Sequence, residues 1–106
     1  MVTNVDLNTV FNSLADGTRR DILRRVSRRE FTVGELAEAY KMSFAGVSKH
    51  IQVLRRAKLI AKRREGRHYI ISLNPTALRT ASSELMQYAQ VWEDRFNRLD
   101  ELLTHT

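Results

Sequence analysis

The sequence predicts a mainly α fold with one two-stranded β-hairpin, in the order α-α-α-α-β-β-α. Three observations lead to this fold class. Apolar residues recur at helical spacing in several short segments up to residue 57. Two short runs on either side of Glu65-Gly66 have the length and apolar spacing of paired strands. From Thr76 to about Leu103 the chain contains no Pro or Gly, which favours one long C-terminal helix.

Two helices are predicted before residue 28. The apolar residues of the first recur at helical spacing, at Leu7, Val10, Phe11 and Leu14. Asp16-Gly17 ends this helix, and Asp16 can cap the second. The second helix turns Ile22, Leu23 and Val26 inward and leaves four arginines in solvent, namely Arg19, Arg20, Arg24 and Arg25. Such a run is most often a solvated face, although Arg19 and Arg20, near the helix start, could also touch a phosphate backbone.

A turn over residues 28–31 leads to a short helix with a recognisable start. Thr32 and Glu35 have the spacing of a capping box, and the packing face of the helix consists of Leu36, Ala37 and Tyr40. Lys41-Met42 makes a tight turn, after which Ser43 can cap the next helix. A short helix, a tight turn and a second helix have the spacing of a helix-turn-helix.

The second of these helices, residues 43–57, separates an apolar face from a basic one. At about 100° per residue, Val47, Ile51 and Leu54 share one face. The opposite, free face consists of Ala45, Ser48, Lys49, Gln52 and Arg56, and the helix has no carboxylate that would repel a phosphate. This composition is typical of a DNA recognition helix. Taken alone, it describes equally well an ordinary amphipathic helix with a basic outer face.

The predicted hairpin carries a basic tip beside this helix. Its strands span Leu59 to Arg64 and Arg67 to Leu73, with Tyr69, Ile71 and Leu73 on one side of the second. The side chains assigned to the tip are Arg63, Arg64, Arg67 and His68. A charged hairpin is often only a soluble sheet edge. Next to a helix-turn-helix, a wing that contacts DNA is the better interpretation, and the fold class becomes a winged helix-turn-helix.

The long C-terminal helix has an apolar stripe. Leu78, Leu85, Trp92 and Leu99 fall seven residues apart, and the flanks add Ala81, Tyr88, Leu102, Ala89, Phe96 and Leu103. A stripe of this length exceeds what a small four-helix core can cover, so we expect it to meet a second copy of the chain. The first helix could join the same surface. The alternative is a helix that folds back over its own domain.

Composition limits the classes of function. The 106 residues are expected to form a single domain, 1–106, and the apolar content of 42% allows a modest core. The net charge of +6 is concentrated in residues 19–67, which hold 15 Lys or Arg against 5 Asp or Glu, as expected for a surface that binds a polyanion. We expect neither a membrane span nor a secretory signal, and hence a cytoplasmic protein. The absence of cysteine excludes disulfides and thiolate metal ligands.

With these segments in place, the chain resembles the ArsR family of bacterial and archaeal winged helix-turn-helix repressors, from about Val10 to Leu103. The resemblance is carried by LADGTRRDIL (14–23), TVGELAEAYKMSFAGVSKHIQVLRRAKLI (32–60), REGRHYIISLNP (64–75) and WEDRFNRLDELL (92–103). It implies an obligate dimer, joined through the first and last helices, that inserts two recognition helices into successive major grooves of an imperfect palindrome.

The resemblance also implies positions for DNA contacts and for the dimer interface. Base contacts are expected from Phe44, Ala45, Ser48 and Lys49, and periodicity adds Gln52. Phe44 lies between the buried and free faces, so a contact to a thymine methyl and core packing stay equally open. The complete DNA-binding set is Ser43, Phe44, Ala45, Ser48, Lys49, Gln52, Arg63, Arg64, Arg67 and His68. The dimer interface set is Val10, Phe11, Leu14, Leu78, Leu85, Tyr88, Trp92, Phe96 and Leu99.

The chain also departs from metal-sensing members of the family. Those members have a Cys-x-Cys pair where this chain has Ala37 and Ala39. The last helix and the chain end contain Glu84, Glu93, Asp94, Asp100, Glu101 and His105, but not at a spacing that pairs carboxylate with imidazole. His50 is interpreted as a packing residue, and His68 as a wing contact or a solvated side chain. We therefore expect neither a metal nor a cofactor.

An enzyme is not predicted, because the sequence has no P-loop, no glycine-rich dinucleotide turn and no nucleophile elbow. Glu35 and Glu38 alone do not make the acidic cluster with which a nuclease holds Mg²⁺. The predicted function is sequence-specific binding of an operator in duplex DNA by a transcriptional regulator. The alternative is a winged-helix module for protein or RNA contacts that reads no duplex bases.

Overall fold

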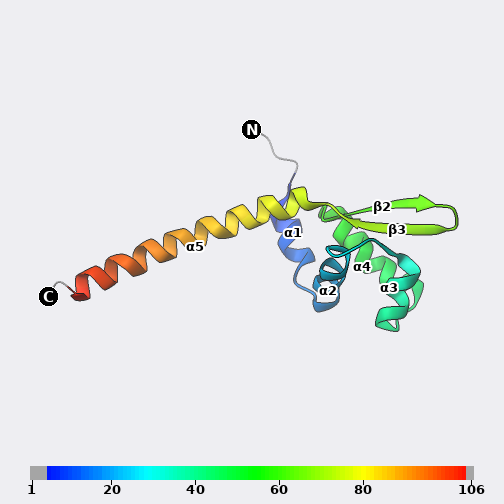
Figure 1. Cartoon of the computed structure of the whole chain (residues 1–106), viewed down its shortest axis with the longest axis horizontal. Helices are drawn as coiled ribbons and strands as arrows, with labels where there is room; N and C mark the ends of the chain where they lie inside the picture. Colours follow the sequence, from blue (N-terminus) through cyan, green and yellow to red (C-terminus); the bar gives the residue numbers. More distant parts are fainter. Residues whose placement is uncertain (1–4, 105–106) are drawn as a thin grey trace.

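The computed structural model describes residues 5–104 and has the predicted mainly α fold with a hairpin wing. Figure 1 shows the elements in chain order. They are α1 (Leu7–Ser13), α2 (Gly17–Val26), β1 (Phe31–Thr32), α3 (Val33–Tyr40), α4 (Phe44–Arg56), β2 (Ile60–Glu65), β3 (His68–Leu73) and α5 (Pro75–Thr104). One short strand, β1, is an addition to the predicted order.

Polar side chains begin the helices at the predicted caps. The Asp16 carboxylate accepts a hydrogen bond from the Arg19 N–H at 3.1 Å at the start of α2. Thr32 and Glu35 form both hydrogen bonds of the predicted capping box at the start of α3, at 3.0 and 2.9 Å. The Ser43 hydroxyl accepts from the Gly46 N–H at 3.0 Å at the start of α4. Each cap satisfies an N–H that has no partner inside its helix.

The core lies between the helices and the inner face of the sheet. Its fully buried side chains include Ile22, Leu36, Val47, Ile51, Leu54, Leu59 and Ile71. At about 1.5–3 kcal/mol for each fully buried aliphatic side chain, these contacts account for the packing of α4 against α2 and α3. Val10 of α1 is 0% exposed and belongs to the same cluster. Its assignment to the dimer interface is therefore wrong, because its side chain is covered by its own domain.

The hairpin is part of a three-stranded antiparallel sheet with the order β1-β3-β2. The β2–β3 pairing runs from Ile60 opposite Leu73 to Glu65 opposite His68, and Gly66 takes a left-handed conformation in the turn, with φ of 61°. The prediction of a turn over residues 28–31 missed β1, in which Phe31 pairs with Ile71 and Thr32 with Ile70. Two residues are too few to show the alternation that identifies a strand.

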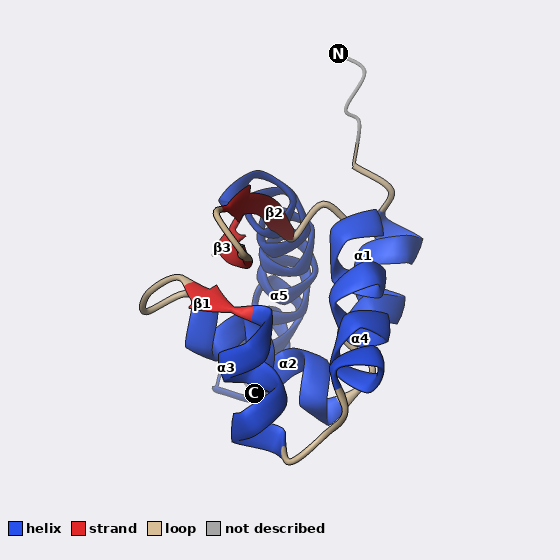
Figure 2. Ribbon diagram, turned by 90° about the vertical axis from the view of Figure 1, so that its right-hand side faces the viewer, coloured by secondary structure: helices blue, strands red, loops and turns tan. Residues whose placement is uncertain are grey.

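The last helix leaves the domain. Figure 1 shows α5 extending to one side of the molecule while the β2–β3 hairpin extends to the other. Its first turns contribute the buried Ala77 and Ala81 to the core. Its 30 residues span about 45 Å, which accounts for much of the 69 Å length of the chain. The alternative of a helix folded back over its own domain is therefore wrong. Figure 2 shows α1 lying alongside α4, with α2 and α3 on the other side.

Candidate nucleic-acid interface

The two faces of α4 are those that the sequence predicts. Val47, Ile51 and Leu54 are buried, whereas Ala45, Lys49, Gln52 and Arg56 are exposed and Ser48 is half-buried. Within residues 5–104, the side chains of Lys49 and Gln52 make no hydrogen bond or ion pair. The free face of α4 thus presents an ammonium and an amide whose hydrogen-bonding groups are available to a ligand.

Phe44, the first residue of α4, is 55% exposed. Of the two interpretations left open by the sequence, core packing is therefore excluded, and the ring lies at the end of the free face. Ser43 has a structural role, since its hydroxyl oxygen accepts the capping hydrogen bond. The hydroxyl hydrogen can still be donated to a phosphate oxygen. Both residues lie where the helix start, with its free N–H groups, favours an anion.

The basic residues of the wing differ in whether their side chains have partners. Arg67 and His68 are exposed beside the turn and make no side-chain hydrogen bond or ion pair within the described part of the chain. Arg64 donates through Nε to the Gly66 carbonyl at 3.1 Å, which holds its guanidinium at the turn. Lys62 lies over the Tyr69 ring, with Nζ 4.4 Å from the ring centroid.

Arg63 is not at the tip. It lies on β2 opposite Ile70, and its guanidinium donates to both carboxylate oxygens of Glu30, at 2.6 and 2.8 Å, and to Glu65 at 3.3 Å. The fork of an arginine fits a carboxylate in this two-bond geometry. These hydrogen bonds raise the pKa of Arg63 and lower that of Glu30. The sequence assignment of Arg63 to the hairpin tip is wrong, because Glu30, 33 positions earlier, lies beside β2 only in the folded sheet.

Two further arginines of α2, predicted to be solvated, instead contact neighbouring helices. Arg19 is half-buried, and its Nε donates to the Ser13 carbonyl at the end of α1 at 2.7 Å. Arg25, also half-buried, pairs with Asp21 at 3.1 Å, and its guanidinium lies 5.2 Å from the centroid of the Tyr40 ring. Helical periodicity places both arginines on the outer face of α2. It does not show which neighbouring helix covers that face.

Tyr40 and Asp21 connect the two helices that precede the recognition helix. The Tyr40 hydroxyl donates to the Asp21 carboxylate at 2.5 Å. Burial, and then this hydrogen bond to a carboxylate, raise the pKa of Tyr40 to about 12. Hydrogen bonds from Tyr40 and then from Arg25 lower the pKa of Asp21. The tyrosine was predicted only as a packing residue, and its acceptor on α2 is a tertiary contact that spacing does not show.

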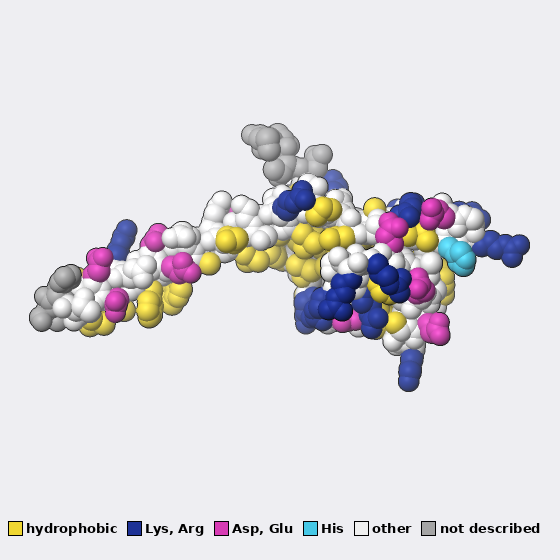
Figure 3. Space-filling view, viewed as in Figure 1, with side chains coloured by type: hydrophobic (Ala, Val, Ile, Leu, Met, Phe, Trp, Pro, Cys, Tyr) yellow, Lys and Arg dark blue, Asp and Glu magenta, His cyan; other side chains and the backbone are white. Residues whose placement is uncertain are grey.

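The predicted dimer surface falls into two parts. Phe11, Leu14 and Leu78 are half-buried and pack against the edge of the core. Further along α5, the other five predicted residues are exposed, and we call them the α5 stripe: Leu85, Tyr88, Trp92, Phe96 and Leu99. The Trp92 side chain is 68% exposed. Figure 3 shows apolar side chains continuing along one edge of α5, beyond the domain.

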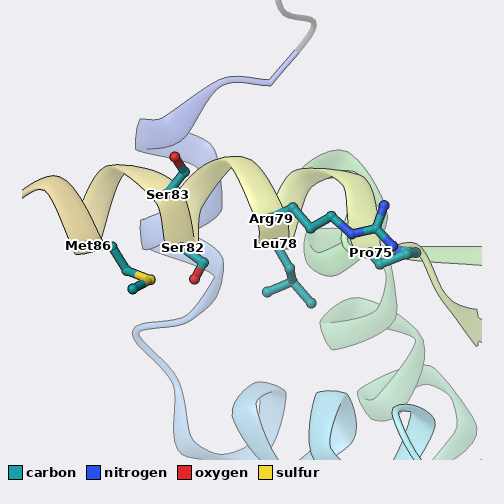
Figure 4. Close-up of a pocket in the computed structure, with 6 residues that line it drawn as sticks. All are labelled: Pro75, Leu78, Arg79, Ser82, Ser83 and Met86. Atoms are coloured by element: carbon teal, nitrogen blue, oxygen red, sulfur yellow. The ribbon is translucent and has the colours of Figure 1, made fainter.

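A shallow hollow of about 500 Å³ lies on α5 where this edge leaves the domain. All six lining residues belong to α5 itself: Pro75, Leu78, Arg79, Ser82, Ser83 and Met86. Figure 4 shows Leu78, Ser82 and Met86 pointing to the same side of the helix and Ser83 to the opposite side. The hollow therefore has one wall only and is not a closed ligand cavity.

Neither a metal cluster nor a membrane span is found in residues 5–104. No group of three or more His, Cys, Asp or Glu side chains in this range is arranged to hold a metal ion. Of the acidic residues and histidine named from the sequence, His105 lies outside the described residues. None of the described helices is both long and apolar enough to cross a bilayer.

A helix-turn-helix whose second helix has a free basic face, next to a β-hairpin with a basic turn, defines a winged helix-turn-helix DNA-binding protein. Residues 14–63 match a family described as a helix-turn-helix domain. The crystal structure of an ArsR family transcriptional regulator superposes with a TM-score of 0.76 at 33% identity, covering 82% of this chain and 90% of the other.

Two curated proteins are similar over most of their length. The transcriptional repressor SdpR of Bacillus subtilis is 32% identical over 82 residues, which are 77% of this chain and 91% of SdpR. The HTH-type transcriptional regulator Rv2034 of Mycobacterium tuberculosis is 37% identical over 78 residues, or 74% of this chain and 73% of Rv2034. The chain belongs to the ArsR family of winged helix-turn-helix transcriptional regulators. It is a DNA-binding regulator, and its relatives are regulators too, which argues against an enzyme.

Proposed function

We propose that the protein is a dimeric repressor that binds an imperfect palindrome, with α4 in the major groove and the wing on the adjacent backbone. The single observation that carries the proposal is the free face of α4, where Lys49 and Gln52 are exposed and without partners in residues 5–104. A lysine can donate to guanine O6 and N7, and a glutamine can bond an adenine edge. Phe44, Ala45 and Ser48 lie on the same surface and complete the proposed reading set.

The α5 stripe supports the dimer. Large apolar side chains rarely cover so much contiguous surface in a monomeric soluble protein. The stripe continues the face on which Ala81 and Leu78 pack against the core, so a second copy would extend the core along α5. Phe11 of α1 and Leu14 at its C-cap lie at the edge of the same core. In the dimer, two copies of α4 would face two half-sites of the palindrome.

Repression rather than activation is supported by the names of relatives. SdpR is a transcriptional repressor, and a further relative from Synechocystis, 32% identical over 80 residues, is a transcriptional repressor SmtB homolog. We propose that this regulator does not sense metals, because it has no cysteine and Ala37 and Ala39 stand where a Cys-x-Cys pair would be needed. We also propose a cytoplasmic location, because the regulator has to reach chromosomal DNA.

The experiment that tests the function is a duplex titration. A site is first selected from a pool of random duplexes, and its affinity is then compared with that of a scrambled duplex. A base-reading regulator should prefer the selected site by ~10³ or more. A module for RNA or protein contacts would show only the salt-sensitive background on both duplexes. In the same titration, low micromolar Zn²⁺, Ni²⁺ or arsenite should leave the affinity unchanged; a tenfold loss reversed by a chelator would show a metal sensor.

A further inference from the structure

Arg19 lies at the meeting point of α1, α2 and α4. Its backbone N–H donates to the Asp16 cap at 3.1 Å, so the start of α2 fixes its position. Its side chain then points back toward the end of α1. Nε donates to the Ser13 carbonyl at 2.7 Å, and Nη2 donates to the Asn12 carbonyl at 3.3 Å. The remaining nitrogen, Nη1, is 3.4 Å from Nδ1 of His50 on α4.

The chemistry of these three contacts fits an arginine. The last carbonyls of a helix lack partners inside it and carry partial negative charge, so a guanidinium at the end of α1 is favourable. An arginine side chain only donates hydrogen bonds, so in this contact the acceptor is the lone pair of His50 Nδ1. One rigid, planar group therefore touches α1 and α4 at the same time.

Besides the packing of Val10 in the core, few side-chain hydrogen bonds tie α1 to other helices in the described part of the chain. Val10 and Ser13 are its buried residues, and the Ser13 hydroxyl donates to the Val10 carbonyl within α1 itself. In the described part of the chain, the side-chain hydrogen bonds that reach the end of α1 from another helix come from Arg19 and from Arg20, which donates to the Leu14 carbonyl at 2.7 Å. Of the two arginines, Arg19 is the one that also contacts α4.

We propose that Arg19 is a positioning residue that fixes α1 against the recognition helix and thereby sets the separation of the two recognition helices in the dimer. This inference rests on the proposed dimer, in which α1 borders the interface. A displacement of α1 there would reach α4 through Arg19 and His50. His50 directly follows Lys49, which lies on the free face of α4, so a shift of His50 would also move Lys49. Arg19 would act on DNA binding without touching DNA.

Loss of the Arg19 side chain should impair the binding of two half-sites together and spare the binding of one. A protein with a loose α1–α4 contact still presents the same side chains to each half-site, but it no longer holds two half-sites at one spacing. Arg19→Gln should therefore lower the affinity for the full operator about tenfold, within the range usual for coupling between sites. Its affinity for a single half-site should stay within about twofold of wild type. Insertion of one base pair between the half-sites should lower the operator affinity of Arg19→Gln by a smaller factor than that of wild type.

The matched control is Arg20→Gln. This variant removes the same charge from the next residue and also removes a hydrogen bond to the end of α1, but within residues 5–104 Arg20 makes no hydrogen bond to α4. It should keep the wild-type dependence on half-site spacing. His50→Leu, which removes the acceptor on α4, should shift the spacing dependence in the same direction as Arg19→Gln. Circular dichroism checks that each variant is folded, and if Arg19→Gln is not, His50→Leu decides.

Three results would overturn the inference. An equal loss on full, half and scrambled sites, with a smaller salt dependence, would make Arg19 a phosphate contact. An unchanged spacing dependence in both Arg19→Gln and His50→Leu would remove the positioning role and leave the dimer intact. If wild type bound a half-site as tightly as the full operator, the proposed dimeric binding would fail first, and the role of Arg19 would fall with it.

Discussion

The Tyr40 hydroxyl and the Asp21 carboxylate form a polar contact between α3 and α2. Tyr40→Phe removes the hydroxyl and keeps the ring, so it isolates the hydrogen bond. We expect a loss of about 1 kcal/mol in the free energy of unfolding, below the ~1.5–3 kcal/mol usual for a charged acceptor, because Asp21 is partly exposed. This corresponds to a fall in Tm of roughly 5 °C. Urea denaturation of wild type and variant at neutral pH measures the difference.

The same pair has a defined pH dependence. The pKa of Asp21 is lowered in the folded protein, so its contribution to stability is present above the ordinary aspartate pKa and is lost as the pH falls through the folded value. The stability gap between wild type and Tyr40→Phe should therefore narrow below about pH 4. A gap that widened in acid would contradict a carboxylate acceptor for the hydroxyl.

Residue-level roles were the hardest to predict from sequence. Spacing placed Val47, Ile51 and Leu54 in the core correctly, because the faces of a helix follow from its period. Arg19 and Arg63 were assigned to solvent or DNA, yet both have partners on other elements. Such partners depend on which elements meet in the folded chain. The sequence alone shows that a position carries an arginine, but not which residue it pairs with.

At the scale of elements, α4 and the wing should differ in what they do to DNA binding. Lys49→Ala should cost ~1–3 kcal/mol on the selected site and less on scrambled DNA, because it removes a base contact. Arg67→Ala should weaken both duplexes alike and lower the slope of log affinity against log salt by about one for each protomer bound, because it removes a phosphate contact from each. A salt series on each duplex measures both effects.

Arg63→Gln is the matched control for the wing. It removes one positive charge from the same hairpin, but the guanidinium is already paired with Glu30. We expect a smaller change in the salt slope than for Arg67→Ala. Were Lys49→Ala to weaken all duplexes equally while Arg67→Ala changed the preferred sequence, the assignment of α4 as reader and the wing as anchor would be reversed.

The elements themselves were mostly predictable, because each has a local signal. The cap at Ser43 and the capping box at Thr32 mark helix starts, and Gly66 marks the hairpin turn. The strand β1 has no such signal. Its two residues become a strand because β3 offers a free edge beside them, which is a property of the folded sheet.

At the scale of the whole molecule, the α5 stripe predicts self-association. The protein should sediment as a dimer at micromolar concentration, and Trp92→Glu should give monomers or unfolded protein, because a carboxylate would be buried in an apolar interface. Ser83→Glu adds the same charge on the opposite side of α5 and should remain a dimer. A wild type that sediments as a monomer, and remains soluble and folded with Trp92 replaced, would refute the proposed interface.

Dimerisation through the exposed length of α5 would make operator occupancy depend steeply on the concentration of the protein. If two chains must join before the operator is bound, occupancy at low abundance rises with the square of the number of chains in the cell. Halving synthesis would then reduce occupancy about fourfold in this range, where a monomeric binder would lose about half. A helix that leaves its domain would thus give the regulated gene a threshold, below which dilution by growth alone is enough to release it.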